Sequence, residues 1–185
     1  MIKETVEKTI DLPEGITAEV SDSTVSIKGR GKEAKRQLKA NGISFKQENN
    51  SIVVIGKPAS RKINALINTI VSHINNMISG LDKDYVYKLV VVYSHFPMNV
   101  AIKGKIVEIK NFVGEKKPRN AKIVEGATVT IKGKDIVVKS HSKEAAGQTA
   151  ANLESVTKVR GKDKRVYQDG IFIVKKGLQE EKESK

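Results

Sequence analysis

The chain has 185 residues, which is enough for one domain or two small ones, and its 4% aromatic content without Trp predicts an aliphatic core. The absence of Cys excludes disulfides and thiol catalysis. The sequence contains no apolar run of about 18 residues, the length that a membrane-spanning helix needs. The N-terminus lacks the features of a secretory signal, so we expect a cytoplasmic location. Thirty-four basic residues against 21 acidic ones give a net charge of +13, which favours a polyanionic partner, either nucleic acid or an anionic membrane surface.

The first half of the chain is predicted to begin with short β-strands. Residues 17–20, 24–29, 43–47 and 51–56 alternate apolar and polar side chains or form short β-branched runs, as strands do. The turn at residues 48–51 contains two Asn, which tolerate left-handed backbone, so the last two strands are expected to form a hairpin.

A long amphipathic helix is predicted to follow these strands. Apolar residues recur at spacings of three and four from Ile63 to Leu81, which places one apolar stripe along about five helical turns. Ser60 is expected to cap the start of this helix and Gly80 to end it. His73 lies off the stripe and has no ligand-spaced partner, so the helix is expected to build the core.

The second half of the chain repeats the order of the first. The segment SIVVIGKPASRKINALIN begins at Ser51 and DIVVKSHSKEAAGQTAAN begins at Asp135, an offset of 84 residues. Strand-like segments at residues 23–29 and 105–111 match at an offset of 82. A second helix is expected over residues 143–159, where Ala, Gly and Thr bury less area than Ile or Leu and permit another backbone to approach closely.

These patterns predict an α+β fold, a tandem duplication of a small unit in which a mostly antiparallel sheet packs with one helix. The first unit is expected at residues 1–83 and the second at residues 84–176. The polar tail, residues 177–185, ends in QEEKESK and is expected to be disordered, because it has too few apolar residues to bury.

Motifs that carry catalytic or metal chemistry are missing from the sequence. The three histidines, His73, His95 and His141, do not have the spacing of metal ligands, and no nucleophile elbow or P-loop occurs. The segment GRGK at residues 29–32 lacks the rest of a phosphate-binding motif and is interpreted as a basic hairpin turn. We therefore expect no catalytic residue, metal, cofactor or small-molecule substrate.

A basic loop in the second half is the candidate binding site. Residues 84–185 carry a net charge of +9, from 21 basic and 12 acidic residues, against +4 for residues 1–83. Five basic side chains within eight residues have no role in packing and are suited to neutralising phosphates: Lys158, Arg160, Lys162, Lys164 and Arg165. Tyr167 offers an aromatic face to a base, and the strand that follows is expected to hold the loop still.

A second basic loop, at residues 114–122, is expected to add RNA contacts. Its candidate residues are Lys116, Lys117 and Arg119, and Pro118 keeps the residue before it extended. A solvated run of charges without a partner is the alternative interpretation of either loop.

Two segments resemble the archaeal and eukaryotic form of the large-subunit ribosomal protein six family. They are the pattern K-x-x-R-x-Y-x-D-G-I-F-I-V at residues 162–174 and VVYSHFPMNV at residues 91–100. The resemblance covers almost the whole chain, and the family is itself a tandem duplication of one α/β unit. Tyr167 stands where the family usually has Phe, and Ser155 stands where it often has Gln, which leaves one polar RNA contact open.

The resemblance implies a structural protein of the large ribosomal subunit rather than an enzyme. Family members bind large-subunit ribosomal RNA near the base of the factor-binding stalk, beside the sarcin–ricin loop and mainly through the second unit. The residues to which this role would be carried over are Lys158, Arg160, Lys162, Lys164 and Arg165, with Lys175 and Lys176 after the strand. Basic residues at strand ends also prevent edge pairing, so the last two have a second explanation.

The first unit, which is less basic, is expected to be available to neighbouring ribosomal proteins near the stalk base or to solvent. The alternative function is a non-ribosomal RNA-binding or anionic-surface-binding module without catalysis. A membrane partner is not expected, because the strongest helix, Ile63 to Leu81, carries few charges beside its apolar face.

Overall fold

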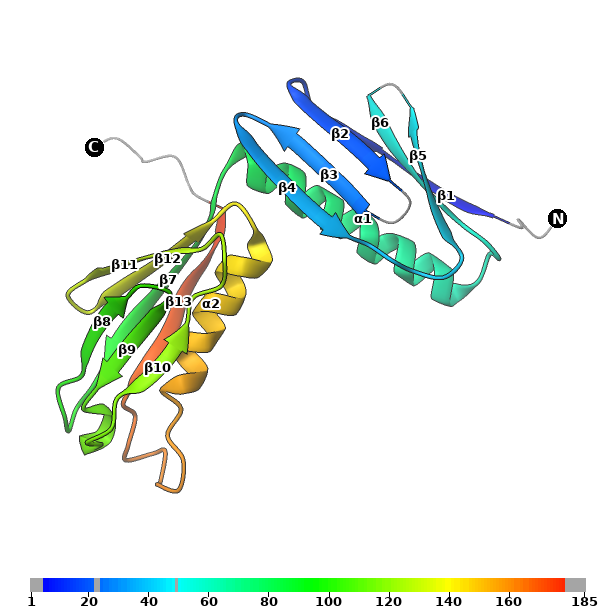
Figure 1. Ribbon diagram of the computed structural model, residues 1–185. Helices are drawn as coiled ribbons and strands as arrows, with labels where there is room; N and C mark the ends of the chain where they lie inside the picture. The colour runs from blue at the N-terminus through cyan, green and yellow to red at the C-terminus, as the bar shows by residue number, and fades with distance from the viewer. Residues whose placement is uncertain (1–4, 22–23, 49, 179–185) are drawn as a thin grey trace. The chain divides into compact units, whose positions relative to one another are not determined.

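Two units follow one another along the chain in the computed structural model, which describes residues 5–21, 24–48 and 50–178 (Figure 1). Unit 1 comprises Met1–Asp82 and unit 2 comprises Lys83–Lys185. Each combines antiparallel sheets with one α-helix, and this confirms the predicted α+β fold.

Unit 1 contains two three-stranded antiparallel sheets and a long helix. The first sheet has the order β1-β6-β5 and consists of β1 (Val6–Asp11), β6 (Ser51–Gly56) and β5 (Ile43–Glu48). The second has the order β2-β3-β4 and consists of β2 (Ile16–Ser21), β3 (Thr24–Gly29) and β4 (Lys32–Gln37). The helix is α1 (Arg61–Asp82), and its apolar stripe packs into the core of the unit.

The four predicted strands of unit 1 are confirmed as β2, β3, β5 and β6. The segment GRGK is a hairpin turn between β3 and β4, in which Arg30 and Gly31 have φ values of 51° and 75°. Two strands were not predicted, β1 and β4. Their segments, VEKTID and KEAKRQ, lack a strong apolar alternation, and they form because the edges of β6 and β3 accept them as hydrogen-bonded partners.

The start of α1 follows the prediction, and its end does not. Ser60 caps the helix, because its hydroxyl accepts a hydrogen bond from the Ile63 N–H at 3.2 Å. The expectation that Gly80 ends the helix was wrong, since α1 continues to Asp82 and Gly80 is buried within it. Leu81 is 1% exposed, and burying this side chain in the core requires one more helical residue after the glycine.

Unit 2 has the same arrangement with one additional strand. A four-stranded sheet of order β11-β12-β7-β13 contains β11 (Thr128–Lys132), β12 (Asp135–Ser140), β7 (Tyr85–Val92) and β13 (Gly170–Leu178). A three-stranded sheet of order β10-β9-β8 contains β10 (Arg119–Lys122), β9 (Ile106–Lys110) and β8 (Asn99–Lys103). The 3-10 turn η1 (Phe112–Gly114) precedes β10, and the helix is α2 (Lys143–Val156).

The duplication is visible in the strand orders. The order β5-β6-β1 corresponds to β11-β12-β7, and the order β4-β3-β2 corresponds to β10-β9-β8. β13 has no counterpart among the described residues of unit 1, because the chain leaves α1 and enters β7 directly. The loop between α2 and β13, which carries the predicted basic site, therefore belongs to unit 2 alone.

The small residues of α2 allow close packing, but the close neighbour at Gly147 is a side chain and not the predicted backbone. Ala146 and Ala150 are fully buried, and a Cβ atom on Gly147 would lie 3.1 Å from the Tyr87 hydroxyl. The helix ends at Val156 rather than at the expected residue 159, because the next residue turns out of the helix to meet β13.

β13 continues to Leu178, two residues beyond the expected end of the second unit. The rest of the polar tail, for which disorder was expected, lies outside the described residues.

Candidate nucleic-acid interface

The α2–β13 loop, residues 157–169, is anchored at its first residue. Thr157 is buried, and its hydroxyl accepts a hydrogen bond from the Ile171 N–H at 2.9 Å and donates to the Leu153 carbonyl at 3.2 Å. Helix α2 and strand β13 are thereby joined where the loop begins. Val159, 9% exposed, adds a second anchor by packing into the core of unit 2.

The last residue of the loop is anchored by a buried carboxylate. The side chain of Asp169 is fully buried, and its Oδ1 accepts a hydrogen bond from the Ser94 N–H at 2.9 Å and lies 3.6 Å from His95 Nδ1. Burial alone would raise the pKa of Asp169, but the hydrogen bonds from Ser94 and His95 outweigh it, so the pKa lies below its ordinary value. Asp169 is therefore ionised at neutral pH and ties the loop to the segment after β7.

Tyr167 is engaged on its ring by two groups of the protein itself. The His95 imidazole stacks on it with 4.8 Å between the ring centroids, and the Lys162 ammonium lies 4.5 Å from the ring centroid. These contacts extend the Asp169–His95 anchor into the loop. Stacking of Tyr167 on an RNA base remains a prediction, and a base would compete with these two groups.

The basic side chains of the loop lie on the surface of unit 2. Lys158, Arg160, Lys162, Lys164 and Arg165 are all exposed, as expected for a loop whose charges do no packing. Within the described part of the chain, no ion pair neutralises Lys158, Arg160 or Lys164. Their positive charge is directed to the solvent and is available to an anionic partner.

Arg165 differs from the other four because it pairs with an acid of the same loop. Its Nη2 donates to Asp163 Oδ2 at 2.9 Å, and this bond lowers the pKa of Asp163. The Asp163 carboxylate also accepts from the Arg165 N–H, and its carbonyl accepts from the N–H of Tyr167, so Asp163 organises a tight turn. The Arg165 side chain remains 90% exposed, and pairs of this kind exchange readily with solvent.

A cleft of about 600 Å³ lies at the base of the α2–β13 loop. Apolar side chains of β7 and β13, including the half-exposed Phe172, form its floor, and Lys158 and Lys164 stand at its rim. The residues that line it are Val92, Glu154, Ser155, Thr157, Lys158, Val159, Lys164, Tyr167, Gln168, Asp169, Ile171 and Phe172.

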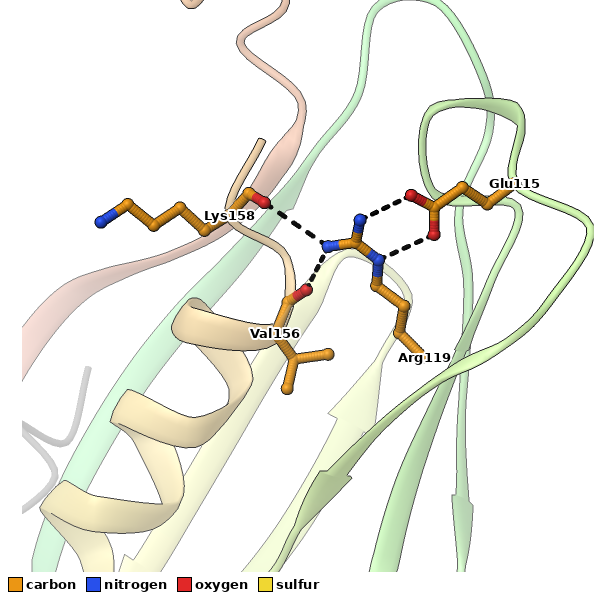
Figure 2. A network of polar contacts seen from close by, with 4 residues as sticks. All are labelled: Glu115, Arg119, Val156 and Lys158. Carbon is orange, nitrogen blue, oxygen red and sulfur yellow. Dashed lines mark hydrogen bonds and ion pairs between the residues drawn. The ribbon is translucent and has the colours of Figure 1, made fainter. Parts of the chain in front are cut away.

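The second predicted basic segment lies beside the first. The η1–β10 loop, residues 115–118, is at the same end of unit 2 as the α2–β13 loop (Figure 1). Lys116 and Lys117 are exposed, whereas the Arg119 guanidinium, at the start of β10, is used within the protein. It is paired with Glu115 and with backbone carbonyls of the α2–β13 loop region (Figure 2). An RNA contact by Arg119 remains a prediction, because the structure shows its guanidinium hydrogen-bonded to groups of the protein itself.

Lys175 and Lys176 lie on β13, the edge strand of the four-stranded sheet, opposite Lys88 and Tyr87 of β7. A β-bulge at Val174 interrupts the strand next to them. Lysines and a β-bulge on an edge strand both hinder pairing of that strand with another chain. The structure is therefore compatible with RNA binding and with edge protection as the role of Lys175 and Lys176.

The anchors of the loop were not predicted as site residues. His95 was considered only as a possible metal ligand, and Asp169 entered only as part of the pattern at residues 162–174. The one indication in the sequence was an acid directly before the glycine that begins a strand. The contacts of Asp169 with Ser94 and His95 join residues about 75 positions apart, which a single sequence does not reveal.

No helix within the described residues is long and apolar enough to cross a membrane. The same residues contain no group of three or more His, Cys, Asp or Glu side chains that could hold a metal ion. The fold is a duplicated α+β unit whose second copy carries exposed basic side chains on an anchored loop.

Comparison with known proteins identifies the family. The model of the ribosomal protein L6 family matches residues 12–84 and 96–170, one match for each unit. The large ribosomal subunit protein uL6 of Methanococcus vannielii is 46% identical over 171 residues, which cover 92% of this chain and 94% of the relative. Those of Saccharolobus solfataricus and Methanosphaera stadtmanae are 45% and 43% identical and cover 90% and 95% of this chain, and 93% and 96% of their own lengths. The chain belongs to the ribosomal protein L6 family, a family of ribosomal proteins and not of enzymes.

Proposed function

We propose that this protein is a structural constituent of the large ribosomal subunit that binds large-subunit ribosomal RNA near the base of the factor-binding stalk. The contacts are made by the basic end of unit 2, which consists of the α2–β13 loop and the adjacent η1–β10 loop. The names of its relatives, all proteins of the large ribosomal subunit, support the assembly, and the resemblance described above supports the location.

The observation that carries the proposal is an exposed basic loop fixed at both ends. Lysines and arginines on a mobile segment would lose conformational entropy on binding, whereas Thr157 and Asp169 hold this loop in place beforehand. Exposed basic side chains that contact phosphates release condensed counterions, and this release favours RNA binding at moderate salt.

The first unit has a different proposed role. Its net charge is only +4 over residues 1–83, and its described residues contain no equivalent of β13 and therefore no corresponding basic loop. We propose that unit 1 faces neighbouring proteins of the large subunit or the solvent. The protein works in the cytoplasm as part of the ribosome.

The experiment is a binding titration between the full chain and a ribosomal RNA fragment that contains the stalk base, repeated over a range of salt concentrations. The variant combines Lys162→Ala, Lys164→Ala and Arg165→Ala, and its affinity should fall by more than about tenfold. The slope of log affinity against log salt should become shallower by about 2 to 3, because each lost phosphate contact contributes about 0.7 to 0.9.

The matched control removes three charges from unit 1, through Lys35→Ala, Lys39→Ala and Lys46→Ala, all of which are exposed lysines. It should bind nearly as well as the parent chain. Equal losses in both triple variants would show a response to net charge alone, and an unchanged affinity of the unit 2 variant would refute the proposed interface.

A further inference from the structure

We propose that Arg119 and Glu115 form a clamp that joins the η1–β10 loop to the α2–β13 loop and so makes one continuous RNA-binding surface from the two. This inference rests on the proposed function. It gives Arg119 a positioning role in place of the RNA contact that its sequence suggests.

The geometry of the guanidinium is that of a bridge between two segments (Figure 2). On one side its Nε and Nη2 donate to the two carboxylate oxygens of Glu115, at 2.8 and 2.5 Å. On the other side its Nη1 donates to the Val156 carbonyl at 2.6 Å and, at 3.4 Å, to the Lys158 carbonyl. The planar, forked donor set of arginine makes both connections at once, and lysine lacks this geometry.

The two carbonyls lie where α2 ends and the basic loop begins. Carbonyl groups in the last turn of a helix have no partner within the helix, and a cation there is favoured by the helix dipole. Arg119 meets this need and holds the backbone of Lys158, the first basic residue of the loop, in place. The Lys158 ammonium points away from the clamp (Figure 2).

The η1 side of the clamp is held in an unusual conformation. Val113 has φ 51° and ψ 33°, a left-handed conformation that is costly for a β-branched residue. Phe112 is buried beside it, and the Arg119 guanidinium carbon lies 4.3 Å from its ring centroid. These contacts offset the cost of the turn that projects Lys116 and Lys117 at the end of unit 2.

Glu115 provides a test in which charge and geometry predict opposite results. Its hydrogen bonds with Arg119 hold its pKa below the ordinary value, so it is an anion beside the proposed RNA surface. If only charge mattered, Glu115→Gln would strengthen RNA binding by removing a negative charge. If Glu115 positions the two loops, the same substitution weakens binding even though the protein becomes more positive.

The experiment measures affinity of the full chain for the stalk-base ribosomal RNA fragment. Glu115→Gln should weaken binding by about two- to tenfold, which is the lower part of the range that coupling between neighbouring residues produces. The matched control is Glu125→Gln, which also removes an exposed acid of unit 2 from an ion pair, in this case with Lys105. It should leave binding unchanged or make it tighter. A Glu115→Gln chain that binds as tightly as the parent overturns the clamp.

A double-mutant cycle separates positioning from a loss of folding. In a Lys116→Ala, Lys117→Ala background, the further loss caused by Glu115→Gln should shrink, because the loop no longer carries charges to position. Full additivity of these changes would contradict the clamp. Arg119→Lys, which keeps the charge but not the fork, should weaken binding to the same degree as Arg119→Gln, and normal binding by Arg119→Lys would likewise contradict it.

The clamp and the proposed function fail in different ways. If the Lys162, Lys164 and Arg165 variant binds normally, the proposed interface is wrong. If that variant binds weakly while Glu115→Gln binds normally, the interface stands and the clamp does not exist.

Discussion

Acidic residues at the basic end of unit 2 hold backbone and side chains in position. Asp169 binds the Ser94 N–H, Asp163 organises a turn, and Glu115 engages Arg119. Each of these acids acts on a nearby part of its own chain and leaves Lys158, Arg160 and Lys164 without an ion pair among the described residues. The consequence is a surface whose shape depends on acids while its charge stays strongly positive.

Asp169→Ala should destabilise unit 2 by about 1–3 kcal/mol, because it removes a fully buried carboxylate that accepts a hydrogen bond from the Ser94 N–H. The free energy of unfolding from denaturant titration measures this loss. Glu154→Ala is the control, and as an exposed helical position it should change stability by less than about 0.5 kcal/mol. Equal effects of the two substitutions would show that the buried contact does not contribute.

The same carboxylate predicts the direction of a pH dependence. The pKa of Asp169 is lower in the folded protein than its ordinary value of 3.8, so its stabilisation is complete above that value. It is lost as the pH falls through the depressed folded-state pKa. Between pH 5 and the acid transition, the free energy of unfolding should fall more for the parent chain than for Asp169→Asn. Parallel plots of unfolding free energy against pH for the two chains would contradict an ionised Asp169. The measurement starts at about pH 5 because this is about one unit above the ordinary pKa of Asp, where the carboxylate is almost fully ionised in both the folded and the unfolded chain.

At the scale of elements, β13 distinguishes unit 2 from the described part of unit 1. The strand pairs with β7 along an edge that has no described partner in unit 1, and its addition creates the α2–β13 loop. The loop contains few apolar residues that could pack into the core. Its order therefore depends on the hydrogen bond that joins the end of α2 to the start of β13. Unit 2 therefore has the basic loop because of one added strand.

Thr157→Val should test this junction. The substitution preserves the shape of the side chain but leaves the Ile171 N–H without its acceptor, and unit 2 should lose about 1–3 kcal/mol of stability. Amide hydrogen exchange at Ile171 should become faster. Thr128→Val, at an exposed position of β11, is the matched control and should leave exchange at Ile171 unchanged. Unchanged exchange in Thr157→Val would contradict the proposed anchor.

The sequence predicts those elements that have strong periodicity. The stripe of α1 and the β-branched runs of β3 and β6 are local patterns, and the structure confirms them. β4 has no such pattern, since its partner strand determines its conformation. The loop of lysines is recognisable by charge, but the contact of Arg119 with the Val156 carbonyl joins residues 37 positions apart, and nothing local encodes it.

At the scale of the whole molecule, the two units have separate cores. The buried cluster around Ile67 and Val25 contains only residues of unit 1, and the cluster around Leu89 and Ile136 contains only residues of unit 2. Because the two clusters share no buried apolar side chain among the described residues, a defect in one core should leave the other intact. RNA binding through unit 2 should then be independent of the stability of unit 1.

Ile67→Ala tests this independence in the full chain. Ile67 is fully buried, and its truncation should destabilise unit 1 by about 2–5 kcal/mol. Thermal unfolding should show an earlier transition of unit 1, while affinity for the ribosomal RNA fragment at a lower temperature stays the same. Leu66→Ala, a 42% exposed neighbour on the same helix, should have little effect on either. A parallel loss of RNA affinity in Ile67→Ala would refute independent units.

The most direct measurement of the central claim is ultraviolet crosslinking of the protein to RNA within intact large ribosomal subunits, followed by mass spectrometry of the crosslinked peptides. The account predicts crosslinks concentrated in peptides that contain residues 158–168 and 115–118, on RNA from the stalk base. Crosslinks confined to unit 1, with none in these two loops, would contradict it.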